Sequence, residues 1–219
     1  MVTLALDDAS GNWFSPTTVE DHGSAVLGTE PAHSPTTFRG ASYHVNGPDL
    51  PTNAITIRTA TMDDGVWILP LSSRLHDFGP PSWRPREEMD AVVAADIEAA
   101  LRAPKEGQVV LVAQDGNGEP LGFVHVHSAV DYFTHEVHSH VSDLAIARDA
   151  EGRGVGRALM IAAESWAAAR GHRLLTLNVF DSNHRARRLY ARLGYSADTT
   201  KLVKILRSSP TPESIPGSS

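Results

Sequence analysis

The sequence of 219 residues contains no cysteine. This absence excludes disulfide bonds, thiolate nucleophiles and cysteine-based zinc sites, and it is compatible with the cytoplasmic location that we expect. No apolar run approaches the roughly 18 residues that a membrane-spanning helix requires, so we expect no membrane partner. The first residues carry no basic stretch ahead of an apolar one, and we therefore expect no secretory signal.

Positive charge is also scarce, because 19 Lys and Arg residues stand against 26 Asp and Glu residues, with a formal net charge of −7. Binding of nucleic acid normally depends on a basic face, so this balance argues against a nucleic-acid partner. An acidic protein is better suited to a cationic or amine-bearing substrate. The hydrophobic share of 41% is that of an ordinary globular protein, and the length allows one medium-sized domain with appendages.

Regular patterns occupy the middle of the chain. Residues 1–52 are rich in Gly, Pro, Ser, Thr and Asp and follow no sustained period of 2 or 3.6, which predicts an irregular N-terminal extension. Residues 208–219 are rich in Pro and Ser and predict a disordered C-terminal tail. A single folded domain is therefore expected at residues 53–207.

Strand-like and helix-like patterns alternate within this domain. The expected strands are Ala54–Thr59, Gln108–Ala113, Leu121–His127, Glu136–Ile146, Leu174–Val179 and one or two within Tyr195–Leu206. The expected helices run from Thr61 towards Leu75, over Arg86–Arg102, over Val155–Arg170 and over Ser182–Leu193. This order predicts an α/β (α+β) fold, in which a mixed sheet carries helices on both faces.

A glycine-rich stretch, Glu151 to Leu159 (EGRGVGRAL), follows an expected strand and opens an expected helix. Glycine permits positive φ and close backbone approach, so successive N–H groups can point at one anion. The partial positive charge of the helix N-terminus adds to this attraction. The pattern predicts a cradle for a pyrophosphate, with a glycine-rich turn that binds nothing as the alternative.

Two other phosphate-binding loops do not match this stretch. A P-loop requires Gly-Lys-Ser/Thr, which the chain lacks. A Rossmann loop would occur near the start of a parallel β-α-β unit, with an acidic residue about 20 positions further on. Here the loop follows a run of expected hairpins, late in the domain.

Together with a second motif, the loop resembles the GNAT superfamily of acetyl-CoA-dependent N-acetyltransferases. The family's loop reads Gln/Arg-x-x-Gly-x-Gly/Ala, here Glu151 to Gly156, with Glu151 in place of the usual Gln or Arg. Asn183 to Tyr190 (NHRARRLY), followed by Leu193-Gly194-Tyr195, matches the family's Asn-x-x-Ala-x-x-Leu-Tyr and Leu-Gly-Phe/Tyr signatures. The resemblance covers residues 56 to 206 and implies the GNAT fold, whose central sheet is mixed and mostly antiparallel.

The resemblance also implies roles for the matching residues. The strand before the loop would expose its backbone at Leu144, Ala145 and Ile146 to the pantetheine arm of acetyl-CoA, the acyl-donor substrate. Asn183 would contact the same arm. The Tyr190 hydroxyl would lie near the thioester sulfur and protonate the leaving thiolate, unless Tyr190 is a core tyrosine. The backbone amides that would hold the pyrophosphate belong to Gly152, Arg153, Gly154, Val155, Gly156 and Arg157.

A base is needed because an amine attacks a thioester only in its neutral form. His140 lies where several family members carry a Glu or His that takes this proton, and it should titrate between about pH 5 and 8 unless burial shifts its pKa. Alternation would put His138, His140 and Ser142 on one face of the strand and Asp143 on the other. A strand histidine without chemistry and a water relay are the alternatives.

Two rival functions compete with acetyl transfer. A GNAT-fold protein that only senses acyl-CoA would keep the cofactor motifs without turnover. A zinc-dependent hydrolase or metal-binding module is the other rival, because five histidines fall in one expected hairpin. It leaves the glycine loop unexplained, so we expect no metal site. The five are His125, His127, His135, His138 and His140.

The acceptor amine stays open at this stage: a polyamine, an aminoglycoside, an arylalkylamine or a peptide N-terminus would each suit, and so would an amino acid held by its carboxylate. The resemblance also leaves a homodimer open. Four arginines of the last helix predict a solvated face, one or two of them within reach of the ribose 3′-phosphate; they are Arg185, Arg187, Arg188 and Arg192. Candidates for the acceptor pocket are Asp77, Trp83, Arg84, Glu87, Glu88, Asp90, Asp131, Tyr132 and Glu136.

Overall fold

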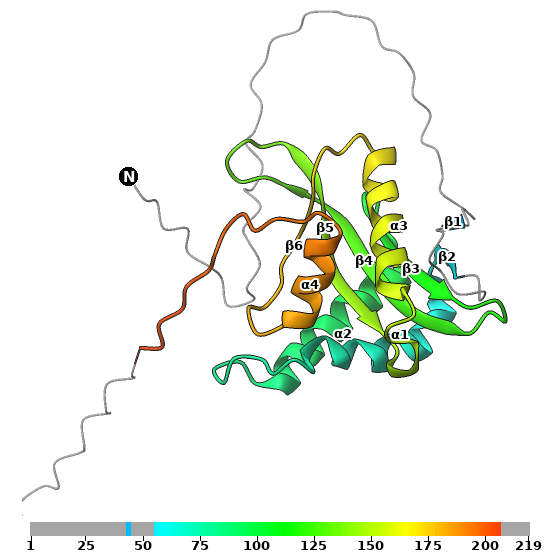
Figure 1. The fold of residues 1–219 in the computed structure, drawn as a ribbon, viewed down its shortest axis with the longest axis horizontal. Helices are drawn as coiled ribbons and strands as arrows, with labels where there is room; N and C mark the ends of the chain where they lie inside the picture. The colour runs from blue at the N-terminus through cyan, green and yellow to red at the C-terminus, as the bar shows by residue number, and fades with distance from the viewer. Residues whose placement is uncertain (1–42, 45–54, 207–219) are drawn as a thin grey trace, which may run out of the picture.

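A computed structural model describes residues 43–44 and 55–206. Its strands form one sheet in the order β1-β2-β3-β4-β5-β6 (Figure 1). Neighbouring strands are antiparallel except β5 and β6, which are parallel, so the expected mixed and mostly antiparallel sheet is confirmed. The strands are β1 (Tyr43–His44), β2 (Thr56–Thr59), β3 (Gln108–Gln114), β4 (Pro120–Val130), β5 (Val137–Ile146) and β6 (Leu175–Leu177).

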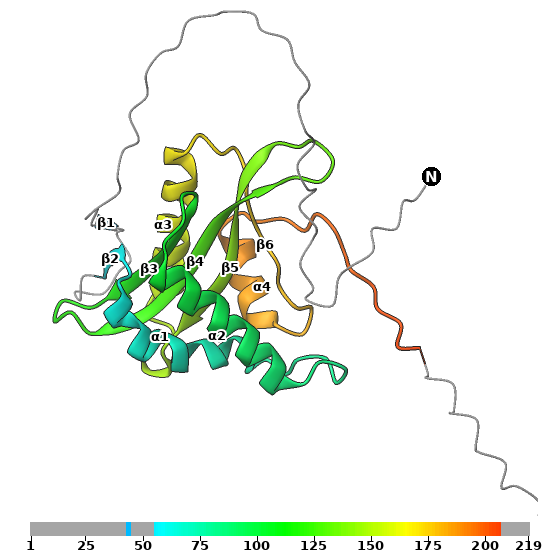
Figure 2. The ribbon, with the colours of Figure 1, turned by 180° about the vertical axis from the view of Figure 1, so that it is seen from behind.

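Helices cover both faces of the sheet, as expected (Figures 1 and 2). Two helices, α1 (Gly65–Ser72) and α2 (Arg86–Arg102), pack on one face, and α3 (Val155–Ala169) and α4 (His184–Arg192) lie on the other. Short 3-10 turns are η1 (Met62–Asp64), η2 (Ser73–His76) and η3 (Arg148–Ala150). None of the described helices is long and apolar enough to cross a membrane.

The two faces are buried to different extents. Helix α3 presents nine buried residues, including Leu159, Met160 and Trp166, to the strands beneath it. Helix α2 buries only Ile97, Ala100 and Leu101. A fully buried Leu, Ile or Met contributes about 1.5–3 kcal/mol, so α3 is much more firmly attached to the sheet than α2.

A β-bulge in β5 changes the expected alternation. His125 of β4 pairs with Asp143 and the next residue, Val126, pairs with Val141, so that one residue of β5, Ser142, is extra. Such an insertion reverses which side chains face each side of the sheet. The expectation that Asp143 lies on the opposite face from His140 is therefore wrong, since Asp143 faces the side covered by α2, beside His125.

The strands β5 and β6 separate after a short contact. Their pairing covers Ser139–Leu175, His140–Thr176 and Val141–Leu177, where β6 ends. Strand β5 continues to Ile146 with no strand on this edge in the part of the chain that is described. We call this opening the β5–β6 fork. It leads directly into the glycine loop before α3.

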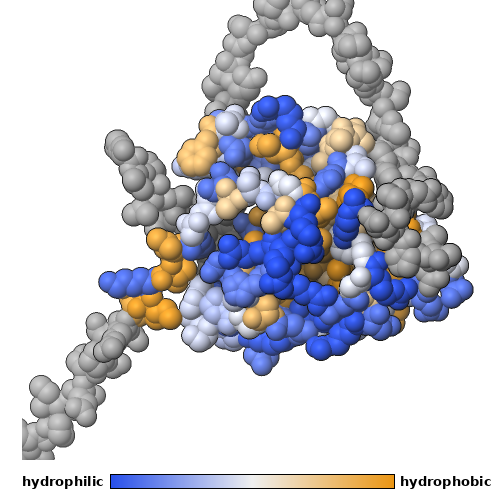
Figure 3. Space-filling model, in the orientation of Figure 1, coloured by the Kyte–Doolittle hydropathy of each residue, from blue (hydrophilic) through white to orange (hydrophobic). Residues whose placement is uncertain are grey.

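One sequence expectation about the end of the domain is wrong. Residues 195–206 contain no strand, although their apolar pattern suggested one, because no described strand pairs with them. Leu202 and Leu206 are exposed. The space-filling view shows hydrophobic residues scattered among hydrophilic ones on this side of the molecule (Figure 3). The short strand β1 lies within the extension that was expected to be irregular. The remainder of residues 1–52 and the tail at 208–219 lie outside the described residues.

Candidate active site

The glycine loop has the backbone conformation that an anion cradle requires. Gly152 and Gly154 have φ values of +77° and +83°, in the region that favours glycine. No atom lies within 4 Å of the position that a Cβ of Gly152 would take. The amides of Val155, Gly156 and Arg157 have no acceptor among the described residues, as expected for the first turn of a helix. The loop therefore offers free N–H groups beside open space.

Gly156 serves packing rather than backbone conformation. A Cβ at this position would lie 2.9 Å from Ile146 Cδ1 and 3.1 Å from Leu189 Cδ2. Glycine lets α3 approach the end of β5 and the side of α4 at the same time. The sequence assigned Gly156 to the approach of a pyrophosphate, and the structure gives it this additional reason.

Glu151 lies beside the β5–β6 fork and connects η2 to α4. Its carboxylate accepts from Arg74 of η2 at 2.6 Å and from Arg185 of α4, and these hydrogen bonds lower the pKa of Glu151 to about 2. Arg74 also donates to the carbonyl oxygen of Ile146. Arg74 also pairs with Asp77, which in turn pairs with Arg86 and Arg148. The four guanidiniums of this network outnumber its three carboxylates, those of Glu151, Asp77 and Asp90. The departure from the family's usual Gln or Arg therefore does not make this region repel an anion.

The four arginines of α4 divide into two pairs. Arg185 and Arg187 are engaged by Glu151 and Asp181. Within residues 55–206, Arg188 and Arg192 have no carboxylate partner. They are the better candidates for a contact with the ribose 3′-phosphate.

Asn183 caps α4. Its side-chain oxygen accepts from the backbone N–H of Ala186 at 3.1 Å, which satisfies one free donor of the first turn. The side-chain nitrogen has no hydrogen-bond partner among the described residues. A structural role thus accompanies the cofactor contact that the resemblance implies.

Tyr190 is half-buried and packs against the core beneath α3. Burial raises the pKa of Tyr190 to about 12, so its hydroxyl keeps its proton at neutral pH. The ring lies 5.9 Å from that of Tyr195, whose hydroxyl donates to Glu164 at 3.2 Å. The hydroxyl of Tyr190 has no partner among the described residues, and it is available to donate a proton.

His140 lies on the face covered by α2, one pair before the fork opens. Its Nδ1 is 2.8 Å from Oγ1 of Thr176 on β6. Burial, reinforced by the neighbouring His127 and His138, lowers the pKa of His140 to about 4. The imidazole is therefore neutral at pH 7, and the expectation that it titrates between pH 5 and 8 gives way to a lower value.

Three further histidines share this face. His127 lies opposite His140 with ring centroids 5.4 Å apart, and its Nδ1 is 2.9 Å from Oγ of Ser142. Burial lowers the pKa of His127 as well. Nδ1 of His138 is buried and has no partner among the described residues. His125 is almost fully buried and lies between Asp143 and Gln108.

The histidine zinc site that the sequence left open as an alternative does not form among the described residues. His135 lies in the turn between β4 and β5, away from this row. Among the described residues, the ligand atoms that converge within 4.8 Å belong to Asp96, His125 and Asp143, and only one of these is a histidine. The four histidines lie on one face of the sheet, but their ring nitrogens do not converge on a common position.

Several of the expected acceptor residues are already paired with other side chains of the protein. Asp77 pairs with Arg86 at 2.9 Å and Arg148 at 3.0 Å, while Asp90 pairs with His76 at 2.6 Å. Glu87, Glu88 and Tyr132 are exposed. Asp131 is half-buried, and its carboxylate accepts from the backbone of Phe133 and Thr134, while Glu136 pairs with Arg173.

One cation of this region is free of carboxylates. The guanidinium of Arg84 stacks over the ring of Trp83 at 4.4 Å and lies 5.9 Å from the ring of Phe180. Phe180 itself stacks on Phe78 at 4.8 Å. Arg84 has no ion-pair partner in residues 55–206, so its N–H groups are available to a ligand.

Sequence reasoning missed several residues that shape the site. Thr176 is fixed by the parallel register of β5 and β6, and Arg74 reaches Glu151 from 77 positions away. No local motif marks either residue. Asp96 and Gln108 were missed for the same reason, although Asp96 lies in a helix that was predicted correctly.

Comparisons with known proteins identify the family. Residues 72–195 match the Acetyltransferase (GNAT) family. The chain is 30% identical over 147 residues to the uncharacterized N-acetyltransferase YhfO of Bacillus subtilis, covering 66% of this chain and 92% of that protein.

Solved structures agree on the fold. The aminoglycoside N-acetyltransferase AAC(6')-Iy in complex with CoA has a TM-score of 0.54 at 19% identity, covering 72% of this chain and 97% of that one. The ribosomal-protein-alanine N-acetyltransferase of Brucella melitensis has a TM-score of 0.52 at 22% identity, covering 70% and 100%. The chain belongs to the GNAT family of N-acetyltransferases.

Proposed function

We propose that this protein transfers the acetyl group of acetyl-CoA to a primary amine. The observation that carries the proposal is the fork between β5 and β6, which opens directly before the glycine loop. The open edge of β5 at Leu144, Ala145 and Ile146 would bind the pantetheine arm. The amides of the glycine loop and of the first turn of α3, among which those of Val155, Gly156 and Arg157 have no acceptor in the described residues, would bind the pyrophosphate.

His140 is the base in this proposal. Its imidazole is neutral at pH 7, so it can accept a proton from the attacking amine directly or through one water. The neutral amine nitrogen attacks the thioester carbonyl carbon, its surplus proton passes to His140, and the carbon–sulfur bond breaks. Tyr190 donates its hydroxyl proton to the leaving thiolate. Its raised pKa keeps that proton in place until the sulfur becomes basic.

The acceptor is proposed only as a class, a small-molecule amine or a peptide N-terminus. The names of the two acetyltransferases of similar fold point to one of each kind. The pairing of both Asp77 and Asp90 with Arg86 weakens the case for a polyamine. Arg84, stacked and free of carboxylates, favours an amine that also bears a carboxylate.

The test follows thiol release from acetyl-CoA against a panel of amines: a polyamine, an aminoglycoside, an arylalkylamine, amino acids and peptides with free N-termini. Gly152→Val should abolish acetyl-CoA binding, measured by calorimetry. Gly118→Val is the matched control, because Gly118 also has a positive φ and open space around its Cβ but lies in the β3–β4 turn. Equal affinity in the two folded variants would refute binding at the loop.

A further inference from the structure

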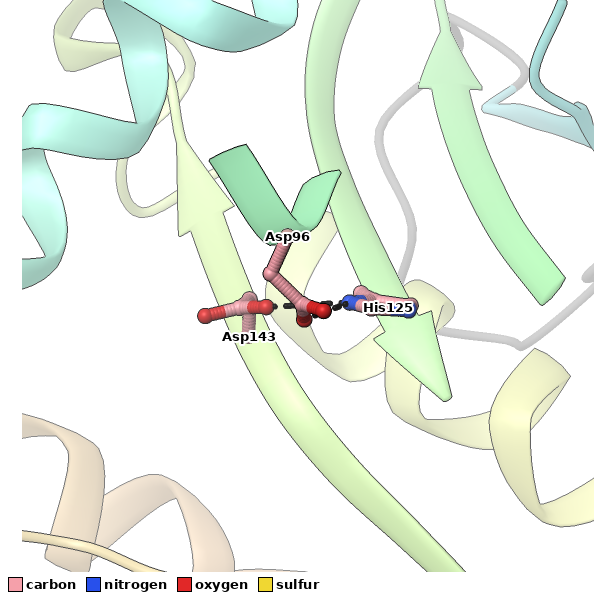
Figure 4. Close-up of side chains that lie close together, drawn as sticks. All are labelled: Asp96, His125 and Asp143. Atoms are coloured by element: carbon pink, nitrogen blue, oxygen red, sulfur yellow. Dashed lines mark hydrogen bonds and ion pairs between the residues drawn. The ribbon is translucent and has the colours of Figure 1, made fainter. Parts of the chain in front are cut away.

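Three ligand atoms converge on the face of the sheet covered by α2 (Figure 4). They belong to Asp96 of α2, His125 of β4 and Asp143 of β5. Nδ1 of His125 lies 3.1 Å from Oδ2 of Asp143 and 3.7 Å from Oδ2 of Asp96. The bulge at Ser142 is what brings Asp143 to this point.

These separations match those around a small tetrahedral ion. Ligand atoms at roughly 2.0–2.1 Å from a zinc ion lie about 3.3 Å from one another. The two measured distances fall on either side of this value. A small movement of the Asp96 side chain, which is 60% exposed, would complete the set of three without disturbing the buried pair.

The charges at this point are incompletely balanced by the protein. Two carboxylates approach one imidazole nitrogen, which carries at most one proton to share. Neither carboxylate pairs with an Arg or Lys within residues 55–206. Asp77, by contrast, pairs with three arginines. A cation at this point would supply the missing charge.

The surroundings of His125 suit a metal ligand. The ring is 1% exposed, and its Nε2 lies 2.6 Å from Nε2 of Gln108. In this arrangement the amide N–H donates to the ring and Nδ1–H donates to Asp143. A half-turn of the amide, which lets its oxygen accept from Nε2–H, frees the Nδ1 lone pair for an ion between the two carboxylates. A partner on the second ring nitrogen fixes the tautomer and orientation of a metal-bound histidine. Burial of His125 and Asp143 gives the site rigid walls, and exposure of Asp96 gives an ion access.

We propose that Asp96, His125 and Asp143 bind one divalent transition-metal ion, for which Zn²⁺ is the best fit. One imidazole and two carboxylates suit Zn²⁺ better than Ca²⁺ or Mg²⁺, which take oxygen ligands almost exclusively. Water would fill the remaining position. The ion would tie α2 to β4 and β5, which matters because α2 buries only three residues.

The experiment uses the full chain without a histidine tag, stripped with a chelator and titrated with Zn²⁺ and, separately, Co²⁺ near neutral pH. We expect one ion per chain by calorimetry and a rise in Tm with Zn²⁺ concentration. Bound Co²⁺ should show the intense visible bands of a tetrahedral site. No binding of either ion by the folded protein would overturn the proposal.

Variants locate the ion. Asp96→Asn, at an exposed position, should weaken Zn²⁺ binding at least tenfold. Glu98→Gln, an exposed carboxylate of the same helix, should leave it unchanged. His140→Gln should also bind normally, because His140 lies outside the cluster. Equal binding by Asp96→Asn and Glu98→Gln, or loss in His140→Gln alone, would place the ion elsewhere and refute the proposal.

Discussion

The pH dependence of catalysis tests His140 most sharply. Burial takes its pKa from an ordinary value near 6.5 to about 4, and this difference corresponds to roughly 3 kcal/mol between the two protonation states. The imidazole is therefore more than about 99% neutral from pH 6 upwards. If His140 is the base, its protonation limits the rate only as the pH falls towards about 4.

The ratio of kcat/KM between the parent and His140→Gln isolates this contribution. Titration of the acceptor amine affects both proteins and cancels in the ratio. We expect a ratio of about 10² to 10⁴ that is constant from neutral pH down to about pH 5.5 and then decreases as His140 gains a proton. His135→Gln, which changes a histidine of the β4–β5 turn, is the matched control and should behave like the parent.

The same shift affects stability. His140 binds a proton in the unfolded chain at about pH 6.5 but in the folded chain only near pH 4, so its contribution is present above 6.5 and is lost as the pH falls between these values. The loss amounts to roughly 3 kcal/mol, and His140→Gln should resist acid better than the parent. Rates are therefore measured only where circular dichroism shows folded protein. A ratio near one at all pH values would assign the proton to water, and a ratio that falls through pH 6–7 would refute the burial argument.

Three further changes have defined outcomes. Tyr190→Phe should lower kcat by about 10²- to 10⁴-fold while the calorimetric affinity for acetyl-CoA stays constant, because the ring keeps its packing; unchanged kcat would make Tyr190 structural. Glu151→Gln removes the charge that offsets Arg74 and Arg185, so acetyl-CoA should bind about two- to fivefold more tightly at low salt. Weaker binding would show that the carboxylate positions these arginines. Asp64→Asn should cost about 1–2 kcal/mol in urea unfolding near pH 7, because Arg58 holds the carboxylate at 2.7 Å through both nitrogens. The pKa of Asp64 is lowered to about 2, so its contribution should disappear as the pH falls from about 4 towards 2.

Local patterns predicted the elements whose residues carry a clear period or a turn. Helix α2 was predicted with its observed limits, and Gly171, at a φ of +73°, ends α3 as expected. The strand expected within 195–206 failed because a strand requires a neighbour, and the pattern of apolar residues does not say whether one is present. The expected helix after Thr61 is divided into η1, α1 and η2, with Pro70 inside α1.

The long-range contacts of the candidate site could not be predicted from local sequence patterns. The loop glycines could be found because positive φ imposes a residue type on a short motif. The partner of His140 could not, because the register between β5 and β6 depends on how α3 connects the two strands. The bulge at Ser142 was equally hidden. A single extra residue moved Asp143 to the face of His125 and created a cluster that strict alternation excludes.

The histidines on the face covered by α2 differ in their distance from the β5–β6 fork. The four are His125, His127, His138 and His140. His125 is held between Asp143 and Gln108, two positions before His127 along β4. His127 is also on β4, so a whole strand separates both residues from the opening. His140 lies on β5 and pairs with Thr176, immediately before the last pair that joins β5 to β6. An amine that reaches a thioester in the fork would meet His140 first. The residue type is common to all four, so our proposal of His140 as the base rests on its position at the point where two parallel strands separate.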